Sequence, residues 1–88
     1  MTQGSNVDAI VRAVLADVLG INPTRVAMFD DDTPLFGALP ELDSMAVAGL
    51  LTEMEDRLHI IIDDDDIDGE MLASFGALLR FAEHKTQG

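Results

Sequence analysis

Three stretches of this 88-residue chain repeat apolar residues at the spacing of an α-helix, and no stretch alternates them as a β-strand would. They are residues 6–20, 44–58 and 74–84. Each repeat forms a stripe that must pack against another element to leave water, so the pattern predicts a small all-α bundle. The stripes contain Ile10, Val11, Val14, Leu15, Val18 and Leu19; Val47, Leu50, Leu51, Met54 and Leu58; and Phe75, Leu78, Leu79 and Ala82.

The ends of these helices carry capping signals. Ser5 followed by Asp8 resembles a capping box, and Gly20 suits the end of the same helix. Ser74 is the expected N-cap of the last helix. A short third helix is expected over residues 64–70, with Ile60 and Ile62 buried ahead of it. The prediction is one domain over residues 1–88, with its core at about 5–85, containing three longer helices and a short helix III.

The connection between the first two long helices is more than 20 residues long and contains three prolines. Such loops are uncommon in small domains and are usually functional or disordered. We expect one helical turn near residues 24–29 and an ordered loop, because apolar residues recur along it and can anchor it to the core. These anchors are Ile21, Val26, Met28, Phe29, Leu35, Phe36 and Leu39.

Acidic residues dominate the charge of the chain, with 17 Asp and Glu against 5 Lys and Arg, a net charge of −12. Such a surface repels nucleic acid and anionic lipid and attracts basic patches on protein partners. No segment has the length of apolar sequence needed for a membrane span or the pattern of a signal peptide, and there is no cysteine. We therefore expect a cytoplasmic monomer that binds no nucleic acid.

Catalytic and metal signals are weak. His59 and His84 are separated from any nucleophile pattern, so an enzyme is not expected. Asp64, Asp66 and Asp68 with the following glycine match half of a calcium-binding EF-hand loop, but the twelfth position is Phe75 instead of a bidentate Glu. No metal site is therefore assigned. An acidic helical module that binds calcium or a protein partner without a prosthetic group remains the alternative function.

Ser44 opens the second long helix after Asp43. A serine there can simply cap free backbone N–H groups. The long loop also delivers it to the surface at the positive end of a helix dipole, which is a favourable place for a phosphate ester. Both interpretations stay open on the residues alone.

Asp43-Ser44-Met45 matches the D-S-[LM] motif that opens the second helix of acyl carrier proteins, and the chain resembles that family along nearly its whole length. EDRLHIIIDDDDID is similar to the family's E-x-x-F-x-I-x-I-x-D-x-[DE], and SFGALLRFAE resembles its last helix. The resemblance implies a carrier on which a phosphopantetheinyl transferase attaches 4′-phosphopantetheine to Ser44. The thiol of that arm would hold acyl groups as thioesters, in fatty acid synthesis or a specialised lipid or secondary-metabolite pathway.

Partner enzymes of this family dock mainly on the second helix and beside the serine. The resemblance assigns partner recognition to Asp43, Met45, Ala48, Thr52, Glu53, Glu55 and Asp56. Ala46 and Gly49 replace usual acidic residues, and Glu41 replaces a usual glycine. This less charged face favours a dedicated acyl ligase or transferase with basic patches over the housekeeping fatty acid synthase. Family members shelter acyl chains between helices, which implies a lining here of Leu50, Leu51, Met54, Ile60, Ile62, Met71, Phe75 and Leu79.

Overall fold

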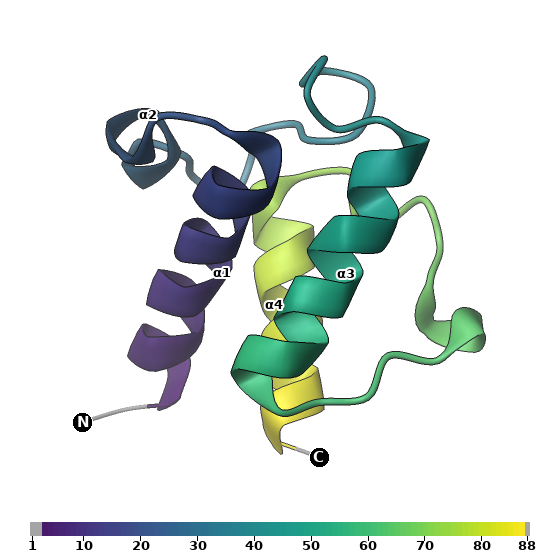
Figure 1. The fold of residues 1–88 in the computed structure, drawn as a ribbon. Coiled ribbons are helices and arrows are strands. Elements are labelled where there is room, and N and C mark those ends of the chain that lie inside the picture. The colour runs from purple at the N-terminus through teal and green to yellow at the C-terminus, as the bar shows by residue number, and fades with distance from the viewer. Residues whose placement is uncertain (1–2, 88) are drawn as a thin grey trace.

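The computed structural model describes residues 3–87, and side chains are described from residue 7 to 86. It is all-helical, as predicted, with three long helices side by side and a short helix at one end (Figure 1). The elements are α1 (Gln3–Leu19), α2 (Pro23–Ala27), α3 (Ser44–Leu58), the 3₁₀ turn η1 (Asp64–Asp66) and α4 (Phe75–Gln87). Across residues 3–87 no helix is long and apolar enough to cross a membrane.

The three predicted stripes meet in one core. α1 packs against both α3 and α4. The largest side chains that are almost fully excluded from water are Phe75, Leu15, Leu35, Leu50, Met54, Leu78, Val11, Val14 and Val26. Ile10, Val18, Val47 and Leu79 lie at the edges of the stripes and are partly buried. The sequence periodicity therefore identified the buried face of each long helix correctly.

The predicted capping box at the start of α1 is wrong. The helix begins at Gln3, so Ser5 lies inside it, and the Ser5 side chain is outside the described part of the chain. The end of α1 is as predicted, because Gly20 takes a left-handed φ of 67°. At α4 the Ser74 hydroxyl accepts a hydrogen bond from the Ala77 amide at 3.2 Å, which confirms it as the N-cap.

The prediction of a short third helix over residues 64–70 is also wrong. The structure has only the single 3₁₀ turn η1 in this segment. Asp68 Oδ1 accepts hydrogen bonds from the amides of Glu70 and Met71, both at 3.0 Å. These side-chain bonds stabilise a turn in place of the helical backbone ladder. Ile60 is buried as expected, whereas Ile62 is only partly buried.

The long loop between α1 and α3 is ordered and contains α2, which supplies the expected helical turn. Asn22 caps it through the Thr24 amide at 2.8 Å. Five of the seven predicted anchors are buried, but Met28 is 80% exposed and Phe36 is 50% exposed, so those two assignments are wrong. The guanidinium of Arg12 donates to the carbonyl oxygen of Val26 at 2.7 Å, which ties the loop to α1.

Two loop segments that are far apart in sequence are joined by backbone hydrogen bonds. The amides of Leu35 and Phe36 donate to the carbonyls of Ala73 and Leu72 at 3.2 and 2.9 Å. Further along, the amides of Phe75 and Gly76 donate to the carbonyls of Thr33 and Asp31 at 2.8 and 3.1 Å. The loop before α3 and the loop before α4 are thereby held together.

Candidate functional site

Ser44 is the first residue of α3, and Asp43 is its N-cap. The Asp43 carboxylate accepts a hydrogen bond from the Ala46 amide at 2.8 Å. The interpretation of Ser44 as the cap is therefore wrong: the preceding carboxylate satisfies that amide, and the exposed Ser44 hydroxyl is left for other chemistry. The first amides of α3 and the helix dipole create a positive potential beside this hydroxyl.

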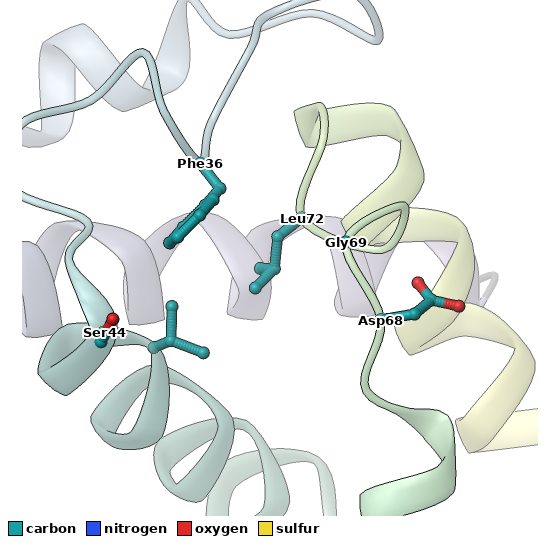
Figure 2. Close-up of a pocket in the computed structure, with 6 residues that line it drawn as sticks. Phe36, Ser44, Asp68, Gly69 and Leu72 are labelled. Carbon is teal, nitrogen blue, oxygen red and sulfur yellow. The ribbon is translucent and has the colours of Figure 1, made fainter.

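A cavity of ≈ 260 Å³ opens beside Ser44. Its walls come from three parts of the chain, and apolar side chains make most of them. The lining residues are Phe36, Ser44, Val47, Asp68, Gly69 and Leu72. Figure 2 shows Phe36 and Leu72 projecting into the space beside Ser44, whereas the Asp68 carboxylate points away from it. The hydroxyl therefore lies at the edge of a small apolar hollow.

The backbone pairing of the two loops positions the walls of this cavity. Because the Phe36 amide bonds to the Leu72 carbonyl, the two apolar side chains are held close together. Phe36 is half exposed because its ring forms a wall of the cavity instead of entering the core. Sequence analysis missed Phe36, Leu72 and Gly69 as site residues, and the one local signal was the Asp68-Gly69 turn.

The expected lining for a sheltered acyl chain does not coincide with this cavity. Of the eight residues proposed for it, six are buried in the helical core and the remaining two, Ile62 and Leu79, are partly buried against it. None of the eight lines the cavity beside Ser44. The closely packed core leaves little room among these eight side chains, and the apolar walls of the cavity beside Ser44 include Val47 and Leu72 instead.

The outward face of α3 runs away from Ser44 and carries little charge. Met45 is 85% exposed, and Ala48, Thr52 and Asp56 follow at helical spacing and are also exposed. Asp43 is exposed before the helix. Five residues assigned to partner recognition therefore lie on an accessible surface.

The other two residues assigned to partner recognition are half-buried at the edges of this face. Glu53 Oε1 is 3.1 Å from Arg57, and Glu55 Oε2 accepts a hydrogen bond from the Ile62 amide at 2.8 Å. Arg57 also lies 2.7 Å from Asp17 of α1, and hydrogen bonds to Asp17 and Glu53 raise the pKa of its guanidinium. Both glutamates thus have structural partners within the protein.

Glu41, which stands three residues before Ser44, is half-buried. Its Oε2 atom lies 3.4 Å from Arg25 of α2. The nearby arginine partly offsets a negative charge that the loop carries close to the serine.

The loop between α3 and α4, residues 59–74, is here called the acidic loop, and it contains the half-match to an EF-hand. Several of its carboxylates bind groups of the protein itself. Asp66 Oδ2 lies 2.5 Å from Lys85 and accepts a hydrogen bond from the Asp63 amide at 3.0 Å. The hydrogen bond from Lys85, followed by that from the Asp63 amide, lowers the pKa of Asp66. Among the residues whose side chains are described, no group of three or more His, Cys, Asp or Glu is placed to hold a metal ion.

Comparison with known proteins identifies the family. The family model described as "Phosphopantetheine attachment site" matches residues 9–82. The solution NMR structure of a holo acyl carrier protein from Nitrosomonas europaea is 36% identical, covers 99% of this chain and 100% of its own, and superposes with a TM-score of 0.83. The chain belongs to the acyl carrier protein family. A comparison with curated protein sequences found no match.

Acyl carrier proteins are carriers and not enzymes, and phosphopantetheine is their covalently attached cofactor. The residues of this carrier fit that group. The exposed Ser44 hydroxyl could form a phosphodiester, the start of α3 favours a negative phosphate, and a cavity with apolar walls opens beside this serine. The family assignment replaces the alternative of a calcium-binding module without a prosthetic group.

Proposed function

We propose that this carrier protein holds acyl groups as thioesters on a 4′-phosphopantetheine arm joined to Ser44. The observation that carries the proposal is the position of Ser44. It is an exposed hydroxyl at the first residue of α3, beside a ≈ 260 Å³ cavity with apolar walls. That volume is near the lower end of the range, ~300–1,000 Å³, that small-molecule sites occupy.

A phosphopantetheinyl transferase would carry out the attachment, as membership of the acyl carrier protein family implies. The Ser44 oxygen forms a bond to the phosphorus atom of coenzyme A that bears the pantetheine chain. The pyrophosphate bond breaks, adenosine 3′,5′-bisphosphate leaves, and the hydroxyl proton passes to the transferase. The free amides at the start of α3 then stabilise the negative charge of the phosphodiester. When attached, the arm supplies the thiol that the cysteine-free chain lacks.

The partners that fit this surface are a phosphopantetheinyl transferase and acyl ligases, transferases or synthases with basic patches. Met45, Ala48, Thr52 and Asp56 give them an accessible strip beside the serine. Because only Asp56 in this strip is charged, we propose that the partner enzymes belong to a specialised lipid or secondary-metabolite pathway. The alternative is that they belong to fatty acid synthesis. The protein would act as a monomer in the cytoplasm.

Mass spectrometry after incubation with coenzyme A, magnesium and a promiscuous phosphopantetheinyl transferase tests the attachment site. We expect a gain of roughly 340 Da, the mass of one arm. Ser44→Ala should abolish the gain while preserving the circular dichroism spectrum, because Asp43 and not Ser44 caps α3.

Ser5→Ala is the matched control, since it removes another serine hydroxyl from the chain, at a position inside α1. It should accept the arm like the unaltered protein. A full mass gain in folded Ser44→Ala, or none in the unaltered protein, would contradict the proposed site.

A further inference from the structure

The acidic loop between α3 and α4 is anchored at both ends by buried residues and in the middle by one cation. Ile60 is buried near its start, and Met71 and Leu72 are buried near its end. Between them, Lys85 of α4 lies 2.5 Å from Asp66, and both side chains are largely covered, at 22% and 29% exposure. Among the side chains that the structure describes, at residues 7–86, this is the one ion pair that reaches residues 59–74.

Asp66 connects Lys85 to the rest of the loop because it also accepts a hydrogen bond from the loop backbone. The oxygen that pairs with Lys85 also accepts the Asp63 amide, and the Asp66 amide donates back to the Asp63 carbonyl at 2.9 Å. The Ile67 amide continues the turn with a bond to Asp64 at 3.2 Å. One lysine therefore restrains a closed turn whose backbone hydrogen bonds lie within the loop itself.

This turn leads directly into a wall of the cavity beside Ser44. Asp68 follows two residues after Asp66, and its carboxylate fixes the next turn through the Glu70 and Met71 amides. The backbone of Asp68 and Gly69 forms a wall across from Phe36, while the Asp68 carboxylate points away from the cavity (Figure 2). A displacement of η1 away from α4 would therefore carry this wall with it and widen the cavity.

We propose that Lys85 is a positioning residue for the arm: its ion pair with Asp66 holds the acidic loop against α4 and keeps the Asp68–Gly69 wall of the cavity in place. The inference rests on the proposed function, because it takes the cavity beside Ser44 as the place where the arm and its cargo lie. Lys85 does not line this cavity, so it acts only through the loop.

Amide hydrogen exchange on the protein without its arm tests the restraint. We expect Lys85→Gln to speed amide exchange at Asp66 and Ile67 by about fivefold. Loss of one partly covered charge-assisted hydrogen bond should raise the equilibrium constant for local opening of the turn by about this factor. Exchange at Met54 and Leu58 in α3 should stay unchanged. Lys85→Arg should behave like the unaltered protein.

Arg80→Gln is the charge-matched control. It removes one positive charge from the same helix, but the nearest carboxylate of Arg80 is Asp31, at 3.9 Å and outside the acidic loop. We expect exchange at Asp66 and Ile67 to stay near that of the unaltered protein. Equal exchange in Lys85→Gln and the unaltered protein, or equal acceleration in Lys85→Gln and Arg80→Gln, would overturn the inference.

The consequence for the arm is tested with an octanoyl thioester loaded on it. We expect hydroxylamine to cleave the thioester severalfold faster in Lys85→Gln than in the unaltered protein, with Lys85→Arg restoring the slow rate. Faster loop exchange with an unchanged cleavage rate would overturn the positioning role and leave a purely structural tether. Failure of every variant to accept an arm would contradict the proposed function instead.

Discussion

At the scale of single residues, neighbouring polar side chains take different tasks according to the direction in which the backbone presents them. Asp43 has extended backbone angles, so its carboxylate reaches the Ala46 amide. Ser44, one position later, is the first residue of the helix and is exposed beside the cavity. In the acidic loop, Asp66 pairs with Lys85 while Asp68 caps a turn. Residue type alone did not distinguish these tasks.

The ion pair of Asp66 gives the stability of the fold a defined pH dependence. Folding lowers the pKa of Asp66 below its ordinary value of 3.8, so the pair stabilises the protein above that pH. The contribution is lost as the pH falls from 3.8 through the lower pKa of the folded state. Asp66→Asn should therefore lower the melting temperature at neutral pH, and the difference from the unaltered protein should shrink in acid.

Asp65→Asn is the control for this measurement, because it removes the same charge from the same turn at an exposed position. Its melting temperature at neutral pH should equal or exceed that of the unaltered protein, since it relieves repulsion. A difference between Asp66→Asn and the unaltered protein that grows in acid would contradict the assignment.

At the scale of the elements, the position of α4 depends on close contact between its first turn and the loop before α3. A Cβ atom added to Gly76 would lie 2.8 Å from the Asp31 carbonyl oxygen, closer than such atoms normally approach. Gly76 also donates its amide to this oxygen. The same contact region holds Phe36 beside Leu72, so the packing of α4 and the shape of the cavity depend on one another.

Gly76→Ala should destabilise the protein by about 1–3 kcal/mol, because the backbone of residue 31 must move. Gly49→Ala on α3 is the contrasting variant: its Cβ would meet only Val18, at an ordinary 3.6 Å. Since alanine favours a helix over glycine, Gly49→Ala should stabilise by about 0.5–1 kcal/mol. Urea denaturation measures both, and equal effects of the two changes would refute the argument.

At the scale of the whole molecule, negative charge exceeds what the basic residues can offset. Every one of the five basic side chains already lies near a carboxylate, yet most of the 17 acidic residues have no such neighbour within the described chain. The folded state concentrates these charges, so repulsion opposes folding. The same surplus attracts basic surfaces on partner enzymes.

Salt should therefore stabilise the fold at neutral pH. We expect the melting temperature to rise between low ionic strength and about 0.5 M sodium chloride, where the screening length is only a few ångströms, and also with millimolar magnesium. The salt effect should largely disappear near the isoelectric point of about 4.1, where the net charge vanishes. An unchanged or lower melting temperature in salt at neutral pH would contradict this explanation.

The sequence by itself determined the three long helices, their buried faces and the placement of Ser44 at the start of α3, because apolar periodicity and the Asp43-Ser44-Met45 motif are local in the chain. The tertiary structure decided the rest of the site. Phe36 and Leu72 become neighbours only through backbone bonds between distant loops, and helix III shortens because Asp66 and Asp68 bind Lys85 and loop amides. These are long-range contacts or competitions between hydrogen bonds, which residue spacing does not encode.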